Sequence, residues 1–200
     1  VILNGQWGHF RPKGNMGDLG QELRGKTLGI YGMGRIGMRL AQQCRGAFDM
    51  NIRYCSRSPN PEAEKSLGAV RVDFNGLCEQ SDVISAHCPL TSETRHLFDM
   101  AAFERMKPTA IFINTARGPV HHEADLVKAL ETGEIWGAGL DVTDPEPMDQ
   151  THPLLAMPNV CVLPHIGSAT REARGLMSKM AAQNIIRFYD DGTLPYQVKV

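Results

Sequence analysis

The chain has 200 residues, of which 42% are hydrophobic and 22% charged, a composition typical of one globular domain with short additions. Its 21 basic and 22 acidic residues leave a net charge of −1, so no broad positive surface is expected to attract nucleic acid or an anionic membrane. No apolar run approaches the roughly 20 residues of a membrane span, and we therefore expect neither nucleic acid nor a membrane as a partner.

The five cysteines are odd in number and widely spaced, and they form no C-x-x-C pair. Neither a disulfide framework nor a zinc site is indicated, so we expect no bound metal and a reducing, cytoplasmic location. The chain begins Val-Ile-Leu-Asn, without Met and without the charged first segment of a signal peptide. Such a start is typical of the middle of a longer chain.

Strand and helix patterns alternate along most of the sequence. Residues 1–24 are glycine-rich, and Trp7, Phe10 and Pro12 suggest an extended segment that wraps a surface. Short apolar runs predict strands at residues 27–31, 51–55, 69–72, 82–86, 110–114, 136–142 and 159–163. Helical spacing predicts helices at residues 35–45, 62–67, 77–80, 99–106 and 123–132.

Two further helical features are expected. A polar helix start is predicted at residues 91–94, and a long helix is predicted to be capped by Ser168 and ended by Gly192. The apolar face of that helix would include Leu176, Met177 and Phe188. Alternating helices and continuously apolar strands predict an α/β fold, a parallel sheet covered on both faces.

The most specific local pattern is a buried strand followed at once by a glycine-rich turn. Gly32, Gly34 and Gly37 have G-x-G-x-x-G spacing between the strand at 27–31 and the helix at 35–45. The first glycine makes a tight turn, the second lets a pyrophosphate approach the backbone, and the third lets helix and strand pack closely. Free N–H groups at the helix start would hold the phosphates. This pattern predicts a dinucleotide site on a Rossmann-type doubly wound sheet.

Reactive side chains follow three later strands of the predicted sheet. Arg117 comes after the fifth strand, Asp141 and Glu146 after the sixth, and His165 after the seventh. Ligands of such sheets bind outside the carboxyl ends of the strands, so these residues are expected near the glycine turn. A histidine can hand a proton to a carbonyl oxygen, a carboxylate beside it favours the imidazolium, and arginine binds a carboxylate with two hydrogen bonds. Together they suit hydride transfer to a 2-oxo acid.

The chain resembles the D-isomer-specific 2-hydroxyacid dehydrogenases, and within them the glyoxylate/hydroxypyruvate reductases, from about Gly5 to its C-terminus. The matching stretches are Gly-Lys-Thr-Leu-Gly-Ile-Tyr-Gly-Met-Gly-Arg-Ile-Gly at 25–37, His-Cys-Pro-Leu-Thr at 87–91, Ile-Asn-Thr-Ala-Arg-Gly at 113–118, Gly-Leu-Asp-Val-Thr-Asp-Pro-Glu-Pro at 139–147 and Leu-Pro-His-Ile-Gly-Ser-Ala-Thr at 163–170. Their order and spacing make the resemblance specific.

The resemblance implies a role for each matching residue. Arg117 would bind the substrate carboxylate and carbonyl, Glu146 would pair with the histidine, and His165 would be the acid and base. Asp141 would meet the nicotinamide carboxamide. Arg35 and Ile36 would lie on the pyrophosphate, Pro89, Thr115 and Ala116 would line the cofactor, and Ile166, Gly167 and Ser168 would close the site beside His165.

The end of the second strand departs from the NAD-preferring members of that family, which carry an acidic residue there for the ribose hydroxyls. This chain has Cys55, followed by Ser56, Arg57 and Ser58. A carboxylate would repel a 2′-phosphate, whereas an arginine with two hydroxyls would hold one. We therefore expect NADP(H) to be preferred, with NAD(H) possible as the cofactor if Arg57 is only a solvated side chain.

The resemblance also predicts the organisation of the chain. Residues 1–20 would be the wrapping segment, residues 21–167 the dinucleotide-binding domain, and residues 168–200 a helix and tail that return to a substrate domain. Family members carry an N-terminal part of that substrate domain before the position where this chain begins, so the substrate domain would be incomplete here and turnover weak. The resemblance further implies a homodimer formed through the cofactor domain.

Three alternatives remain open on the sequence alone. A dinucleotide-sensing corepressor that is not an enzyme can keep the Arg–Glu–His set on this fold. A methyltransferase with a similar glycine turn would need none of that set and would bind S-adenosylmethionine. The chain could also be an isolated cofactor-binding module with little activity.

Several other residues are interpreted as structural. His121 and His122 precede a helix and are expected on the surface, and His152 has no group of reactive residues near it in the sequence. Met106 and Met177 are expected to fill the core.

Overall fold

The computed structural model describes residues 20–198. The wrapping segment expected over residues 1–20, with Trp7, Phe10 and Pro12, lies outside this range except for its last residue. The strands are β1 (Thr27–Tyr31), β2 (Asn51–Cys55), β3 (Val70–Arg71), β4 (Val83–Ala86), β5 (Ile111–Asn114), β6 (Gly137–Leu140) and β7 (Val160–Val162). The helices are α1 (Arg35–Phe48), α2 (Pro61–Leu67), α3 (Phe74–Gln80), α4 (Met100–Arg105), α5 (Glu123–Thr132) and α6 (Arg171–Asp191), with short 3-10 helices η3 (Gly118–Val120) and η4 (Pro153–Ala156).

All seven strands form one parallel sheet in the order β3-β2-β1-β4-β5-β6-β7. The chain starts in the middle at β1, moves outward to β3, and then returns to place β4 on the other side of β1. Leu28 of β1 therefore pairs with Ile52 of β2 on one side and with Val83 of β4 on the other. The expected Rossmann-type doubly wound sheet is confirmed, and its strand order reverses between β1 and β4, where such folds bind their ligands.

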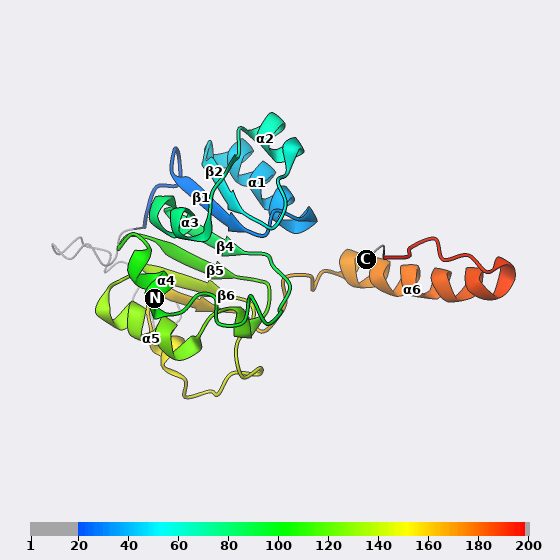
Figure 1. Ribbon diagram of the computed structural model, residues 1–200. Helices are drawn as coiled ribbons and strands as arrows, with labels where there is room; N and C mark the ends of the chain where they lie inside the picture. Colours follow the sequence, from blue (N-terminus) through cyan, green and yellow to red (C-terminus); the bar gives the residue numbers. More distant parts are fainter. Residues whose placement is uncertain (1–19, 199–200) are drawn as a thin grey trace, which may run out of the picture.

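Two hydrophobic cores lie on opposite faces of the sheet (Figure 1). One forms where α1 and α2 pack on β1 and β2, with Ile30 and Ile52 fully buried. The other forms where α3 packs on β1 and β2 and where α4 and α5 pack on β4, β5 and β6, with Phe103, Phe112 and Leu126 fully buried. Because successive side chains of a strand point to opposite faces, β1 and β2 contribute to both cores.

Helices lie on both faces of the sheet as expected, but their cover is incomplete over part of it. Phe112 of β5 is fully buried beneath α4 and α5, whereas Ile111 and Ile113, on its other face, are only half-buried. In β7, Cys161 is exposed and its two neighbours are half-buried. Among residues 20–198, α1 and α2 cover the β1–β3 half of their face and leave the β5–β7 half partly open.

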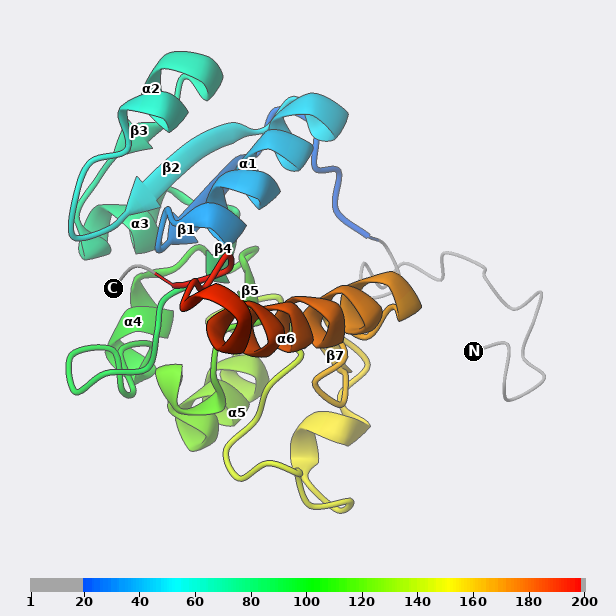
Figure 2. The same ribbon diagram turned by 90° about the vertical axis from the view of Figure 1, so that its right-hand side faces the viewer.

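Helix α6 is set apart from the sheet in Figure 1, and Figure 2 looks along the direction in which it projects, so that it lies in front of the sheet there. None of its side chains is buried, and Leu176, Met177 and Phe188 of the expected apolar face are each about half exposed. The expectation that Met177 fills the core is therefore wrong, while Met106 is buried as expected. No helix within residues 20–198 has both the length and the apolar character needed to cross a membrane.

The predicted cap of α6 and the predicted helix start at residues 91–94 were both wrong. The cap of α6 is Thr170, whose Oγ1 accepts from Ala173 N at 3.0 Å, and Ser168 lies before it. The expected helix start at residues 91–94 is a turn, because Thr94 Oγ1 accepts from Thr91 N and donates to Pro89 O. Threonine side chains of this kind satisfy backbone groups locally and compete with helix formation.

Candidate active site

The glycine turn lies between β1 and α1, and each glycine meets a different constraint. Gly32 has a φ of +101°, and a Cβ there would lie 2.7 Å from His87 O. A Cβ on Gly37 would lie 2.4 Å from Gly32 O, so only glycine lets α1 pack this closely on β1. Gly34, the residue before α1, faces open space. The open side of Gly34 at a helix N-terminus fits a bound pyrophosphate.

A cavity of about 380 Å³ opens beside this turn, where the carboxyl ends of β1, β2 and β4 meet. The cofactor residues predicted at the end of β2 line it together with Gly32, Gly34 and Pro89. Arg71 of β3 holds the loop after β2, since its Nη2 donates to the carbonyl oxygens of Ser56 and Arg57 at 2.9 Å each. Ser56 Oγ donates to Ser58 O at 2.6 Å, which tightens the same loop.

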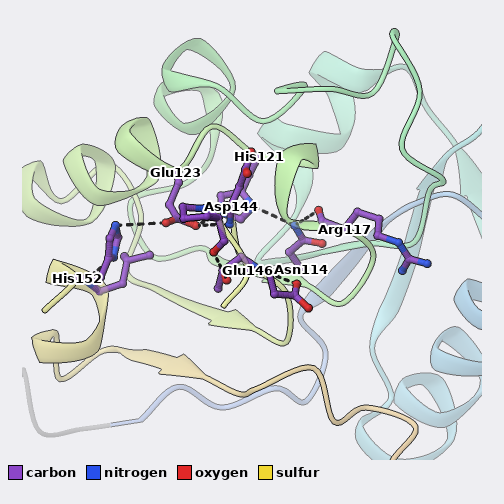
Figure 3. A network of polar contacts seen from close by, with 10 residues as sticks. Asn114, Arg117, His121, Glu123, Asp144, Glu146 and His152 are labelled. Carbon is purple, nitrogen blue, oxygen red and sulfur yellow. Dashed lines mark hydrogen bonds and ion pairs between the residues drawn. The ribbon is translucent and has the colours of Figure 1, made fainter. Parts of the chain in front are cut away.

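A second hollow of about 420 Å³ continues from the first and shares His87, Cys88 and Pro89 with it. Ile36, Thr115, Ala116 and Arg117 line this hollow, so the structure brings these predicted residues together. Arg117 is exposed, its Nη1 donates to Ala116 O at 2.6 Å, and its guanidinium points away from Glu146 (Figure 3).

A third hollow, of about 470 Å³, contains Asp141, Glu146 and His165. His165 Nδ1 lies 2.6 Å from Glu146 Oε1, and the two side chains are about half exposed. His165 adopts a φ of 54°, a left-handed conformation that is uncommon outside glycine. The structure thus joins the predicted acid–base pair directly, while Arg117 lies in the neighbouring hollow.

Asp141 has a contact that the sequence did not predict. Its Oδ1 accepts from Ile166 N and its Oδ2 from Gly167 N, each at 2.8 Å. A Cβ on Gly167 would lie 2.9 Å from that carboxylate, so the close approach depends on glycine. Asp141 therefore fixes the backbone that follows His165, and its contact with a nicotinamide carboxamide stays a prediction.

The glycine turn and the three hollows lie along one edge of the sheet, at the carboxyl ends of its strands. Residues 2–167 match the family model described as "D-isomer specific 2-hydroxyacid dehydrogenase, NAD binding domain". The chain belongs to the D-isomer specific 2-hydroxyacid dehydrogenase family.

Relatives within this family carry consistent names. The chain is 50% identical over 185 residues to a glyoxylate reductase of Aeropyrum pernix, covering 92% of this chain and 55% of that protein. It is 50% identical over 167 residues to glyoxylate/hydroxypyruvate reductase B of Escherichia fergusonii, covering 84% of this chain and 52% of that protein. The chain thus spans about half the length of the curated relatives it matches.

Solved structures of the 2-hydroxyacid dehydrogenases show the same fold. The structure of a D-lactate dehydrogenase with NAD+ from Lactobacillus jensenii superposes with a TM-score of 0.86 at 30% identity, covering all of this chain and 62% of that one. The family model is that of an NAD-binding domain, so this domain is one that binds a nicotinamide dinucleotide. That the glycine turn holds the pyrophosphate stays a prediction.

Sequence reasoning missed a group of polar residues behind the site (Figure 3): the buried Asn114, His121 and Glu123, and the partly exposed His152. His121, expected on the surface, is fully buried, and His152, expected to stand alone, has Nε2 3.2 Å from Glu123 Oε1. Glu123 is the first residue of α5 and is 9% exposed. Carboxylates are common at helix starts, so nothing in the sequence indicated that Glu123 also contacts residues far along the chain.

No cluster of three or more metal-ligating side chains occurs within residues 20–198.

Proposed function

We propose that this chain supplies the cofactor-binding part of an NADP(H)-dependent enzyme that reduces glyoxylate or hydroxypyruvate to the 2-hydroxy acid. Residues 21–167 would form the dinucleotide-binding domain, and residues 168–200 would reach a substrate domain. The names of relatives that are 50% identical in sequence support this substrate class.

The observation that carries the proposal is the pairing of His165 with Glu146 on the edge that also bears the glycine turn. An ionised carboxylate can only accept hydrogen bonds, so Glu146 keeps a proton on His165 Nδ1. His165 Nε2 is then the atom that passes a proton to the substrate oxygen. The carboxylate also stabilises the charged imidazolium that the reducing direction requires.

The other proposed roles follow the arrangement of the hollows. The nicotinamide, when bound, supplies the hydride. Arg117 would bind the substrate carboxylate through its planar guanidinium and orient the 2-oxo group. The cofactor would be held by Gly32, Gly34, Arg35, Ile36, Gly37, Pro89, Thr115, Ala116, Asp141, Ile166 and Gly167.

A preference for NADP(H) is supported by the loop after β2. Arg57 is exposed at the cavity, with the hydroxyl residues Ser56 and Ser58 on either side of it. Cys55, the last residue of β2, carries no charge that would repel a 2′-phosphate. Because Arg71 fixes the backbone of this loop, Arg57 starts from a defined position. An arginine held in this way suits a phosphate monoester.

A homodimer in a reducing, cytoplasmic location completes the proposal. The thiols of the five cysteines are all free, which supports such a location. Size-exclusion chromatography with light scattering tests the dimer, and a monomer at all concentrations would contradict it.

One experiment tests the activity and the cofactor preference together. The full-length protein is assayed for NADPH and NADH oxidation with glyoxylate, hydroxypyruvate, pyruvate and phosphohydroxypyruvate, alongside Arg57→Ala. We expect turnover with glyoxylate or hydroxypyruvate, and a loss of about tenfold or more in kcat/KM for NADPH in the variant, with NADH little affected. The exposed Arg39 on α1 gives the control variant Arg39→Ala.

Either half of this proposal can fail separately. A folded protein that binds NADPH but oxidises it with none of the four acids is not the proposed enzyme. A ratio of NADPH to NADH efficiency that stays the same in Arg57→Ala contradicts the assigned role of that arginine.

A further inference from the structure

Two loops carry the proposed catalytic side chains, and they touch each other behind the site. A Cβ on Gly118, the residue after Arg117, would lie 1.9 Å from Thr143 O and 3.0 Å from Asp144 N. The backbone that follows Arg117 is therefore packed directly on the backbone that leads to Glu146. Any shift of one loop must move the other.

Asn114 fixes the first of these loops. Its Oδ1 accepts from Ala116 N at 2.9 Å, and its Nδ2 donates to Arg117 O at 2.9 Å. These two partners define the amide orientation, since the N–H must face Oδ1 and the carbonyl must face the NH2. The same Nδ2 lies 2.9 Å from His121 Nδ1, which must therefore be an acceptor.

His121 is consequently neutral, with its proton on Nε2. Burial lowers the pKa of His121 to about 4, which agrees with a neutral ring at pH 7. Nε2 has no hydrogen-bond partner, and it lies 3.8 Å from Glu123 Oε2. Burial raises the pKa of Glu123, and the hydrogen bond from Asp144 N and the nearby His152 oppose that rise. The His121 N–H dipole at this distance also favours the ionised carboxylate without satisfying a hydrogen bond.

Glu123 fixes the second loop. Its Oε2 accepts from Asp144 N at 3.0 Å, and its Oε1 lies 3.2 Å from His152 Nε2 (Figure 3). A hydrogen bond from Asp144 N and a close contact with His152, from different parts of the chain, thus converge on one buried carboxylate. Asp144 is two residues before Glu146, and Thr143 N lies 3.5 Å from Glu146 Oε2, so the anchored backbone also bears on the Glu146 side chain.

We propose that Glu123 is a positioning residue, whose carboxylate holds the loop at 143–147 so that Glu146 stays paired with His165. The role in catalysis rests on the proposed function, whereas the anchoring of the loop does not. Hydrogen bonds to a charged acceptor are stronger than neutral ones, and a buried N–H left without an acceptor is costly. Glu123 therefore acts on the site through Asp144 and touches none of the reacting atoms.

Hydrogen exchange tests the anchoring in this chain without any activity assay. In Glu123→Ala, the Asp144 amide should exchange about 10-fold to 100-fold faster than in the parent, because a charge-assisted hydrogen bond is lost. Glu123→Gln should keep most of the protection, because its amide oxygen can still accept from Asp144 N. The Gln NH2 would then face the N–H of His152 Nε2, because His152 Nδ1 accepts from Leu154 N, and the partly exposed His152 ring would have to turn towards solvent. Glu131→Ala, an exposed carboxylate on the same helix, is the matched control.

Kinetics of the full-length enzyme test the link to the site. Glu123→Ala should lower kcat about tenfold or more while leaving the NADPH dissociation constant within about twofold, and Glu123→Gln should recover most of kcat. If only the general stability of the fold matters, NADPH affinity and melting temperature should fall with kcat in both variants, which would overturn the proposal.

Two other outcomes also decide the matter. Equal exchange of the Asp144 amide in the parent and in Glu123→Ala overturns the anchoring whether or not the protein is an enzyme. Faster exchange in Glu123→Ala with no turnover by the parent would support the anchoring and defeat the proposed function instead.

Discussion

At the scale of single residues, the site depends on side chains that hydrogen-bond to backbone groups and so fix the loops around it. Asp141 and Asn114 each make two or more hydrogen bonds close to the predicted catalytic set, and Glu123 makes one hydrogen bond and one close contact with His152. In a buried environment such satisfied polar groups restrict the backbone to one arrangement. The residues that touch the ligand are thus positioned by residues that need not touch it.

His121 gives the protein a pH-dependent stability with a defined direction. The pKa of His121 is about 4 in the folded protein, against the ordinary value of 6.5 expected in the unfolded chain. At pH values between these two, the unfolded chain therefore binds the proton more tightly. The free energy of unfolding should therefore fall as pH drops from 6.5 towards 4, by about 2 to 3 kcal/mol at pH 4.5 from this group.

The measurement compares urea unfolding of the parent and of His121→Gln at pH 7.5 and pH 4.5. The variant keeps an acceptor for Asn114 but cannot titrate, so it should lose about 2 to 3 kcal/mol less than the parent on acidification. Burial also lowers the pKa of His87, and that contribution is common to both proteins. Equal losses in the two proteins would show that His121 does not titrate differently on folding.

At the scale of elements, Asn60 joins a helix cap to the glycine turn. Its Oδ1 accepts from Ala63 N at 3.0 Å and caps α2, while its Nδ2 donates to Met33 O at 3.0 Å, between Gly32 and Gly34. Tyr54, buried in β2, accepts from Asn60 N at 2.8 Å. The start of α2 therefore braces the turn that would hold the pyrophosphate.

Two substitutions separate the cap from the brace. Asn60→Ser keeps a capping oxygen but is too short to reach Met33, whereas Asn60→Ala loses both contacts. We expect the Ala variant to be about 1 kcal/mol less stable than the Ser variant. Both should bind NADPH about fivefold more weakly than the parent. Titration calorimetry and urea unfolding measure the two effects, and a Ser variant that binds NADPH as the parent does would leave the brace without a role.

Helix α6 is expected to be the least protected long helix within residues 20–198. It has a side-chain cap at Thr170 and ends at Gly192, which has a φ of +74°, but none of its side chains is buried. Helices in proteins gain most of their stability from packing, so the amides of α6 should exchange much faster than those of α5, where four residues are buried. Protection of α6 equal to α5 and dependent on protein concentration would mean that a second copy covers it.

At the scale of the whole molecule, the sequence predicted the sheet well because buried parallel strands are continuous apolar runs between helices. The runs at residues 27–31 and 51–55 coincide with β1 and β2. The rule that ligands bind at the carboxyl ends of strands brought Glu146 and His165 together correctly, although they come from different strand ends.

The sequence could not predict features that depend on distant backbone. The burial of His121 results from its packing against Phe112 and Asn114, neither of which is its neighbour along the chain. The anchoring of Asp144 by Glu123 likewise joins α5 to the loop after β6. The partly open face of β5–β7 was missed because half-buried isoleucines have the same sequence pattern as fully buried ones.

The place of β4 beside β1 also has a consequence for how the chain folds. Every other strand pair in the described sheet joins strands that follow each other along the chain, whereas β4 must return past β2 and β3 to find β1. Contacts that close long loops are slow to form, because the chain loses conformational entropy before the favourable energy of the contact is gained. During synthesis, β1 to β3 can assemble early, and β5 to β7 can each add to the newest edge once β4 has docked. We therefore expect the joining of the two halves at β1 and β4 to be the slowest of the strand pairings, and it is also the step that completes the binding crevice.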